Sequence, residues 1–218
     1  MIIKDSEIDS IDASTFNNQN TLRTLKINKS NIHNITNTSF KFLEDLEKLD
    51  LSDNNIDAIE KTFLKPLVNL KVIELSNNGL TDLDAKVFKF NKELRTVNLH
   101  GNNLADLSCD LLKFQINLKS LNISSNQLTK LPCNVIHRQG IHLKELDMSG
   151  NQLHKRWNKL IAHEKRGAGH KVRKMMLKAE VGKNDEAKEE NICLVCEKNL
   201  PTRKAMKEKW EEQALEQL

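Results

Sequence analysis

Apolar residues in the first part of the chain recur with a period of 24 residues. Six hydrophobic columns keep this spacing, and the last repeat is one residue longer. The clearest columns are Leu22, Leu46, Leu70, Leu94, Leu118 and Leu143; Leu25, Leu49, Ile73, Val97, Leu121 and Leu146; Ile27, Leu51, Leu75, Leu99, Ile123 and Met148; and Phe16, Phe40, Leu64, Phe88, Leu112 and Ile136. A fixed period of this length predicts a stack of structural repeats.

Within each repeat, two of the apolar columns alternate with polar residues. Leu25 and Ile27 alternate with Thr24, Lys26 and Asn28, and this two-residue period predicts a short strand with one buried side. A single 24-residue unit cannot bury its own apolar columns, whereas stacked units cover one another. The sequence therefore predicts a parallel sheet that contributes one short strand per repeat and forms the concave side of a solenoid.

A polar column follows each predicted strand. It contains Asn54, Asn78, Asn102, Asn126 and Asn151, which accounts for part of the abundance of Asn. An Asn side chain can both donate and accept hydrogen bonds, so it can satisfy backbone groups at a buried bend. Ser6 and Ser30 occupy this column in the first repeats, and we expect a weaker polar ladder there.

The pattern Leu-x-x-Leu-x-Leu-x-x-Asn-x-Leu resembles the leucine-rich repeat family over residues 1–153. The resemblance implies an α/β solenoid of one partial and six further repeats, to which we add a helical C-terminal tail. Because the chain begins in the middle of a repeat, we expect it to be part of a longer protein. Such proteins are mostly recognition modules, and the resemblance implies no enzymatic activity.

The type of repeat indicates a location. The segments "ITNTSFKF" and "LDAKVFKF" are similar to the typical repeats of Toll-like and other extracellular proteins, which favours an extracellular or secreted protein. The segment "LTKLPCNVI" is similar to repeats common in intracellular proteins, so a cytoplasmic location stays open. The chain shows neither an apolar run long enough to span a membrane nor a signal segment after Met1.

Charge is distributed unevenly along the chain. The 218 residues include 34 Lys or Arg and 30 Asp or Glu, a net charge of +4 that does not favour nucleic acid as a partner. Residues 154–178 alone hold nine Lys or Arg and one Glu. We expect the segment 154–182 to cap the stack, and the alternative is an electrostatic contact with an anionic surface.

The last segment, 183–218, combines a Cys pair with a predicted helix. Met206, Trp210, Ala214 and Leu218 recur every four residues, so the helix has one apolar face that could support self-association. Cys193 and Cys196 resemble the start of a zinc module, but the remaining ligands are missing. They are weak metal candidates, and a disulfide bond or two thiols are the alternatives, so we expect no cofactor.

Two other cysteines occupy one column of successive repeats. Cys109 and Cys133 are 24 residues apart, and stacking brings such positions to about 5 Å, within the range that a disulfide bond spans. The alternative is a pair of free thiols.

Four Asn residues lie in Asn-x-Ser/Thr sequons, which are candidate glycosylation sites: Asn28, Asn34, Asn37 and Asn122.

The outward positions of the predicted strands form the candidate binding surface. They are basic at the first repeats, then acidic, then neutral and polar, and the residues we select are Lys26, Lys48, Asp50, Glu74, Asn98, His100, Asn122 and Asp147. This surface predicts a protein partner on the concave face, as in innate-immunity receptors or adhesion proteins. The alternative is an intracellular adaptor, such as one for a ubiquitin ligase with a truncated zinc module. No catalytic motif is present.

Overall fold

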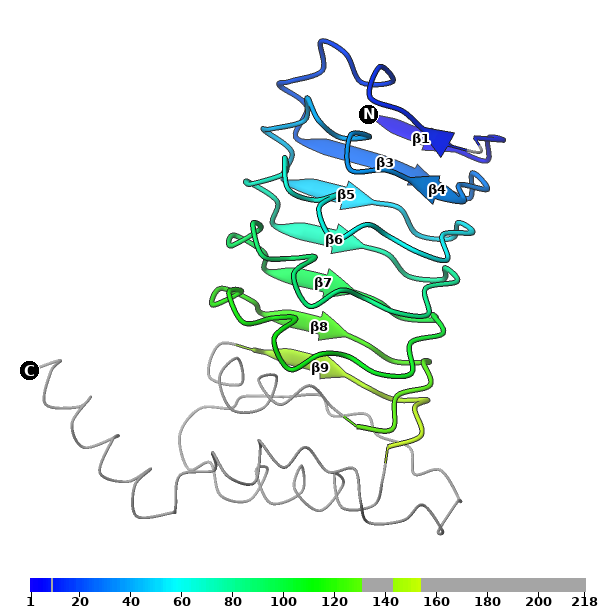
Figure 1. The fold of residues 1–218 in the computed structure, drawn as a ribbon, viewed down its shortest axis with the longest axis vertical. Helices are drawn as coiled ribbons and strands as arrows, with labels where there is room; N and C mark the ends of the chain where they lie inside the picture. Colours follow the sequence, from blue (N-terminus) through cyan, green and yellow to red (C-terminus); the bar gives the residue numbers. More distant parts are fainter. Residues whose placement is uncertain (9, 131–142, 154–218) are drawn as a thin grey trace, which may run out of the picture. The chain divides into compact units, whose positions relative to one another are not determined.

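The computed structural model describes residues 1–8, 10–130 and 143–153, which form a curved stack of repeats (Figure 1). The chain divides into two units, Met1–Asn184 and Asp185–Leu218, and every described residue belongs to the first. The strands are β1 (Ile2–Lys4), β2 (Ser10–Ile11), β3 (Thr24–Asn28), β4 (Asn34–Ile35), β5 (Lys48–Asp50), β6 (Val72–Glu74), β7 (Thr96–Asn98), β8 (Ser120–Asn122) and β9 (Glu145–Asp147).

Seven strands form one parallel sheet, in the order β1-β3-β5-β6-β7-β8-β9. Each strand pairs with the next at an offset of 24 residues, as Leu25 does with Leu49, and the last pair, Leu121 with Leu146, is offset by 25. This register is the one that the apolar columns predict, and the parallel solenoid is thereby confirmed. The predicted helical tail lies outside the described residues, as do the segments 154–182 and 183–218.

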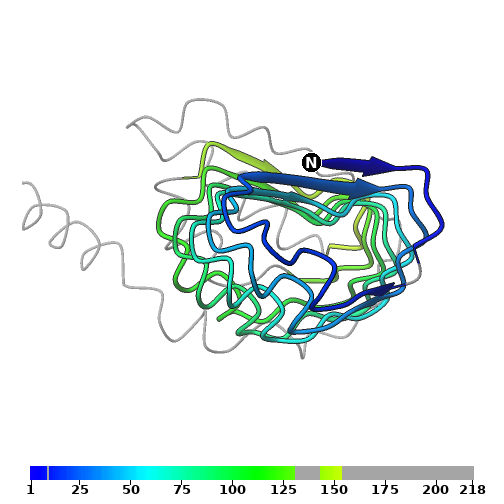
Figure 2. The same cartoon turned by 90° about the horizontal axis from the view of Figure 1, so that it is seen from above.

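A second, two-stranded parallel sheet pairs β2 with β4. It lies across the stack from the seven-stranded sheet, as the view from above shows (Figure 2). The remaining described residues of each repeat form turns and irregular segments. Backbone hydrogen bonds between residues three apart close the turns. For example, the Phe16 carbonyl accepts from Gln19 N–H at 3.1 Å.

The core lies between the sheet and these turns. The predicted inward columns are buried, with Leu25, Leu49, Ile73 and Val97 all at 0% exposure. Phe side chains continue the core on the turn side: the ring centroids of Phe16 and Phe40 are 6.1 Å apart, and those of Phe40 and Phe63 are 6.3 Å apart. Phe63 lies one position before the aromatic column, so the sequence period alone did not indicate it.

Buried Asn side chains connect each strand end to the preceding repeat. The Asn102 amide nitrogen donates to the Leu75 and Leu99 carbonyls, at 3.0 Å each, while its Oδ1 accepts from Leu80 N–H at 3.1 Å. The same pattern of bonds recurs at Asn54, Asn78, Asn126 and Asn151. The hydroxyl of Ser30, a fully buried residue, donates to the Asn28 carbonyl of its own repeat at 3.1 Å, whereas the Ser30 backbone N–H donates to Asn54 Oδ1 at 3.0 Å.

Candidate functional site

The concave sheet presents the polar columns at which we expect a partner to bind. Most of the selected side chains are half-buried, since each is flanked by the same column of the neighbouring strands. They are Lys26, Lys48, Glu74, Asn98, His100, Asn122 and Asp147. Asp50 is more deeply buried than the others, with 9% of its surface exposed. The sheet therefore brings all eight residues to one surface, in the order that the sequence predicts.

A local motif fixes many of these side chains to their own strand ends. Asp50 Oδ1 accepts from the hydroxyl of Ser52 at 2.7 Å, and Asp147 Oδ1 accepts from that of Ser149 at 2.7 Å. In the repeat between them, Asn98 Oδ1 accepts from the backbone N–H of His100 at 3.1 Å. These bonds hold the acceptor side chains along the sheet surface, which lowers the conformational entropy that a partner's binding would cost.

Hydrogen bonds also run across three repeats at the centre of the surface. Asn98 Nδ2 donates to Glu74 Oε2 at 2.8 Å. Ser124 donates its only hydroxyl hydrogen to Asn122 Oδ1 at 2.6 Å, and it contacts His100 Nδ1 at 2.8 Å. Ser124 therefore accepts from Nδ1–H of His100. In the neutral ring, Nε2 is then left as a hydrogen-bond acceptor for a partner.

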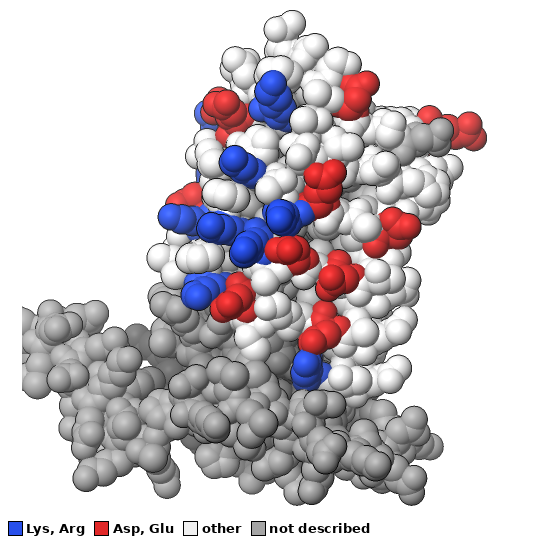
Figure 3. Space-filling view, viewed as in Figure 1, with Lys and Arg blue, Asp and Glu red and all other residues white. Residues whose placement is uncertain are grey.

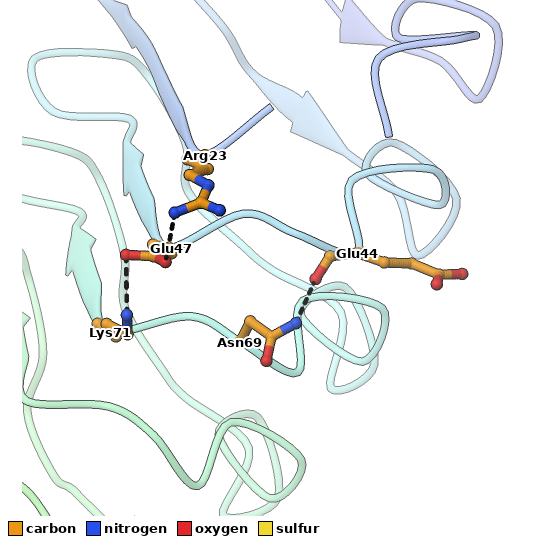
Figure 4. Close-up of polar contacts among 5 residues, drawn as sticks. All are labelled: Arg23, Glu44, Glu47, Asn69 and Lys71. Carbon is orange, nitrogen blue, oxygen red and sulfur yellow. Dashed lines mark hydrogen bonds and ion pairs between the residues drawn. The ribbon is translucent and has the colours of Figure 1, made fainter. Parts of the chain in front are cut away.

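The two basic residues at the start of the surface form no ion pair with another described residue. Every ion pair within the described part of the chain involves other residues than Lys26 and Lys48. Next to them, Glu47 lies one position before β5 and contacts two cations: its carboxylate is 2.8 Å from Lys71 Nζ and 3.8 Å from an Arg23 guanidinium nitrogen (Figure 4). The bond from Lys71 lowers the pKa of the Glu47 carboxyl from its ordinary value.

Figure 4 also shows a contact between successive turns that the repeat pattern did not predict. Asn69 Nδ2 donates to the Glu44 backbone carbonyl at 3.0 Å, whereas the Glu44 carboxylate extends away from that bond. The side chain of Asn69 is thus engaged with the turn of the previous repeat. It restrains the flank on which Glu47 and its two cations lie.

The other predicted sites fall partly outside the described residues. The Cys109 sulfur is in a disulfide bond, while Cys133, Cys193 and Cys196 lie outside those residues, so the pairing of Cys109 with Cys133 stays a prediction. Within the described ranges, no three His, Cys, Asp or Glu residues are arranged to hold a metal ion. Among the sequons, Asn34 and Asn37 are exposed, whereas Asn28 and Asn122 are half-buried on the sheet.

Sequence reasoning missed a second amide ladder on the turn side. Asn91 Nδ2 donates to the carbonyls of Leu64 and Leu67 at 2.9 and 2.7 Å, and Gln115 Nε2 donates to that of Phe88 at 2.7 Å. Both residues are fully buried, at positions where earlier repeats have Leu43 and Leu67. With only two amides in an otherwise apolar column, the sequence carries too weak a pattern to reveal this ladder.

Charges are segregated to opposite flanks in the central repeats of the stack, whereas residues 41–47 before β5 hold one Lys and three acids. The three segments that precede β6, β7 and β8, residues 65–71, 89–95 and 113–119, hold seven Lys or Arg and one acid. The three that follow β5, β6 and β7, residues 53–60, 77–84 and 101–108, hold six acids and no Lys or Arg. Figure 3 shows this separation on the face viewed, with Lys and Arg gathered toward the flank where the strands begin.

Comparison with solved structures shows the same fold. The chain superposes on chains of three solved structures. They are the LRIM1/APL1C complex (24% identity, TM-score 0.64), the Toll–Spatzle complex, described as a hub in Drosophila development and innate immunity (25%, 0.63), and the TLR13–ssRNA13 complex (26%, 0.62). Each match covers 68% of this chain but only 27%, 19% and 21% of the other. The chain thus spans about a fifth to a quarter of these proteins.

A search of curated proteins found no match. Within the described residues, no helix has the length and apolar character needed to cross a membrane. Family models of the leucine-rich repeat match residues 1–56, 45–104, 117–138 and 141–155. These matches cover most of the repeats that the register defines, and the chain belongs to the leucine-rich repeat family.

Proposed function

We propose that the chain is a non-enzymatic recognition module that binds a protein partner on its concave sheet. The observation that carries the proposal is the linked set of side chains from Glu74 to Ser124, which are held by hydrogen bonds across three repeats. Side chains that are already ordered lose little entropy on binding. The partner would present donors to Glu74 and His100 Nε2, and acidic groups to Lys26 and Lys48.

Two of the similar structures support a protein as the partner class. The Toll structure is a complex with Spatzle, and LRIM1 is in complex with APL1C. The TLR13 structure holds single-stranded RNA instead. The concave sheet of this chain alternates in charge from Lys48 to Asp50 and Glu74, and such acidic positions repel phosphates. This distribution favours a protein with complementary charge over RNA.

Photo-crosslinking tests the concave site even when the identity of the partner is unknown. A photoreactive residue in place of Asn98 should capture a protein from extracellular fluid, whereas the same residue in place of Lys61, exposed outside the sheet, should not. Glu74→Lys should then weaken the captured partner's binding by about tenfold or more. Equal capture from both positions, or full affinity of Glu74→Lys, would contradict a concave site.

We further propose an extracellular or secreted location, supported by the disulfide bond of Cys109, since such bonds persist in oxidising compartments. Chain produced through the secretory route should carry glycans at the exposed Asn34 and Asn37. A glycosidase should lower its mass, and Asn34→Gln/Asn37→Gln should remove most of that shift. A chain whose mass does not change on treatment would leave the cytoplasmic alternative as the better interpretation.

A further inference from the structure

Exposed apolar side chains collect on the basic flank of the stack. Apart from Met1 and Ile2 at the start of the first strand, all the exposed large hydrophobic residues within the described ranges lie in the segments that precede β5 to β8. They are Phe42, Val68, Phe90, Phe114 and Ile116, with exposures between 37% and 60%. Scattered single exposures are ordinary on a protein surface, but confinement to one column of turns marks an interaction site.

A row of lysines accompanies these apolar residues. Lys41, Lys65, Lys89 and Lys113 occupy the same position of four successive repeats, and all four are exposed. At the spacing of neighbouring strands, the row is about 15 Å long. We call these four lysines and the five apolar residues the Lys-Phe stripe.

Contacts within the stripe show that its two kinds of side chain lie together. The ammonium groups of Lys65 and Lys89, which come from successive repeats, lie 5.8 and 5.5 Å from the ring centroid of Phe90. Lys41 Nζ lies 5.3 Å from the ring of Phe42. Of these four lysines, only Lys113 forms an ion pair within the described residues, with Asp110 at 3.6 Å and with both side chains exposed. The stripe is therefore basic and apolar over the same small area.

From this combination we infer that the Lys-Phe stripe binds the surface of an anionic lipid bilayer. Lysines are attracted to anionic headgroups, while exposed Phe, Val and Ile side chains gain free energy by entering the acyl boundary. The six acids of the opposite flank would face away from the bilayer, so the segregated charges would orient the stack on it.

The composition of the stripe fits a bilayer better than other anionic partners. Val68 and Ile116 have no aromatic face on which a nucleic-acid base could stack. All the cations in the row are lysines, which are depleted at protein–protein interfaces, whereas the planar groups of arginine suit paired recognition of phosphate. Soluble polyanions would leave the exposed aliphatic side chains without a role.

Vesicle co-sedimentation of the full chain tests this inference. The chain should bind vesicles of phosphatidylcholine with phosphatidylserine, and bind those of phosphatidylcholine alone weakly. Lys65→Glu/Lys89→Glu/Lys113→Glu should reduce binding to the anionic vesicles on the order of a hundredfold. Lys4→Glu/Lys29→Glu/Lys61→Glu changes the net charge equally at exposed lysines that belong neither to the stripe nor to the selected concave residues, and it should keep most of the binding. The basic residues 154–178 are present in both variants, so the difference reports on the stripe.

A second measurement separates a bilayer from a soluble polyanion. In a Trp157→Phe/Trp210→Phe background, Phe114→Trp places the only indole in the stripe, and bromine-labelled lipids should quench its fluorescence on binding. Thermal unfolding verifies that each variant is folded. Equal vesicle binding by the two triple variants would overturn the inference. The inference would also be overturned if the lipids did not quench the indole and heparin displaced the chain from the vesicles. The stripe would then be a site for soluble polyanions.

Discussion

At the scale of single residues, the turn after each strand requires a left-handed backbone. One column of positions has positive φ, and it contains Asp5, Lys29, Asp53, Asn77, Gly101, Ser125 and Gly150. The repeat thus forces this conformation even on residues that pay a cost for it. Gly101 is required for a second reason, because a Cβ there would lie 2.4 Å from Asn77 Oδ1. That amide is itself held by a 2.8 Å bond from its Nδ2 to Asp53 Oδ1.

We therefore expect Gly101→Ala to lower the free energy of unfolding by about 1 to 2 kcal/mol, through backbone strain and the displaced Asn77 amide. Gly79→Ala is the matched control. The nearest atom to a Cβ at Gly79 is 3.6 Å away, and its φ is not positive, so the change should be neutral or stabilise slightly. Urea unfolding of both variants measures the difference. Equal losses in the two would show that the left-handed turn is not the cause.

The Glu47 carboxylate makes stability depend on pH. Because the hydrogen bond from Lys71, with smaller effects of Arg23 and Arg95, lowers its pKa in the folded chain, ionised Glu47 favours folding. This contribution is present above the ordinary pKa of 4.5 and is lost as the pH falls through the lower folded value. The stability difference between the unchanged chain and Glu47→Gln should therefore shrink between about pH 6 and pH 3. In a Lys71→Met background, the stability difference between the Glu47 and Glu47→Gln chains should depend less on pH. If its pH dependence stayed the same, Lys71 would not be the main cause of the lowered Glu47 pKa.

At the scale of the element, each repeat depends on the amide that connects it to its neighbour. Removing Asn102 would leave the N–H of Leu80 buried without a partner. It would also take one of two amide donors from each of the Leu75 and Leu99 carbonyls, which keep their bonds from Asn78 and Asn126. We expect Asn102→Ala to cost about 2 to 4 kcal/mol, since the unpartnered N–H costs about 1 to 3 kcal/mol and each lost bond to a carbonyl about 1 kcal/mol. Ser30→Ala, in the same column, removes one bond within its own repeat and should cost about 1 kcal/mol or less. Similar losses in denaturant unfolding would mean that the bonds between repeats are not the stabilising ones.

The elements were predictable to the degree that the repeat was regular. Positions such as Leu49 and Ile73 fixed the strands and their register because a solenoid places equal positions side by side. Asn91 and Gln115 were not predicted, since polar residues in an apolar column normally argue against burial. The selected residues lie on the sheet as the period predicts, but the bond between His100 and Ser124 depends on side-chain geometry that no period encodes.

The Lys-Phe stripe escaped prediction for a related reason. The sequence shows the pairs Lys41 with Phe42 and Lys89 with Phe90. It also shows the aromatic column that contains Phe40 and Phe88. Yet the turn exposes Phe42 and Phe90 while it buries Phe40 and Phe88, two positions earlier. Phe is equally hydrophobic at both positions, so in these two repeats the path of the turn decides which ring faces solvent.

At the scale of the whole molecule, stability is expected to vary along the stack. In a solenoid each repeat contacts only its neighbours, so a terminal repeat has half of the stabilising interfaces of a central one. In the described sheet β1 pairs only with β3, whereas β6 pairs with both β5 and β7. Equivalent backbone hydrogen bonds differ in length between a central repeat and the first one. Asn77 N–H donates to the His100 carbonyl at 2.8 Å, while Asp5 N–H donates to the Asn28 carbonyl at 3.4 Å.

Hydrogen exchange of the full chain should therefore show a gradient, with the Asp5 amide exchanging on the order of a hundredfold faster than that of Asn77. Both residues have the left-handed backbone of the same column, so local conformation does not account for the difference. Asn102→Ala should raise exchange in β6 and β7 more than in β1, because it opens the interface between those central repeats. Exchange that rises equally in every strand would instead show that the described repeats unfold as one cooperative unit.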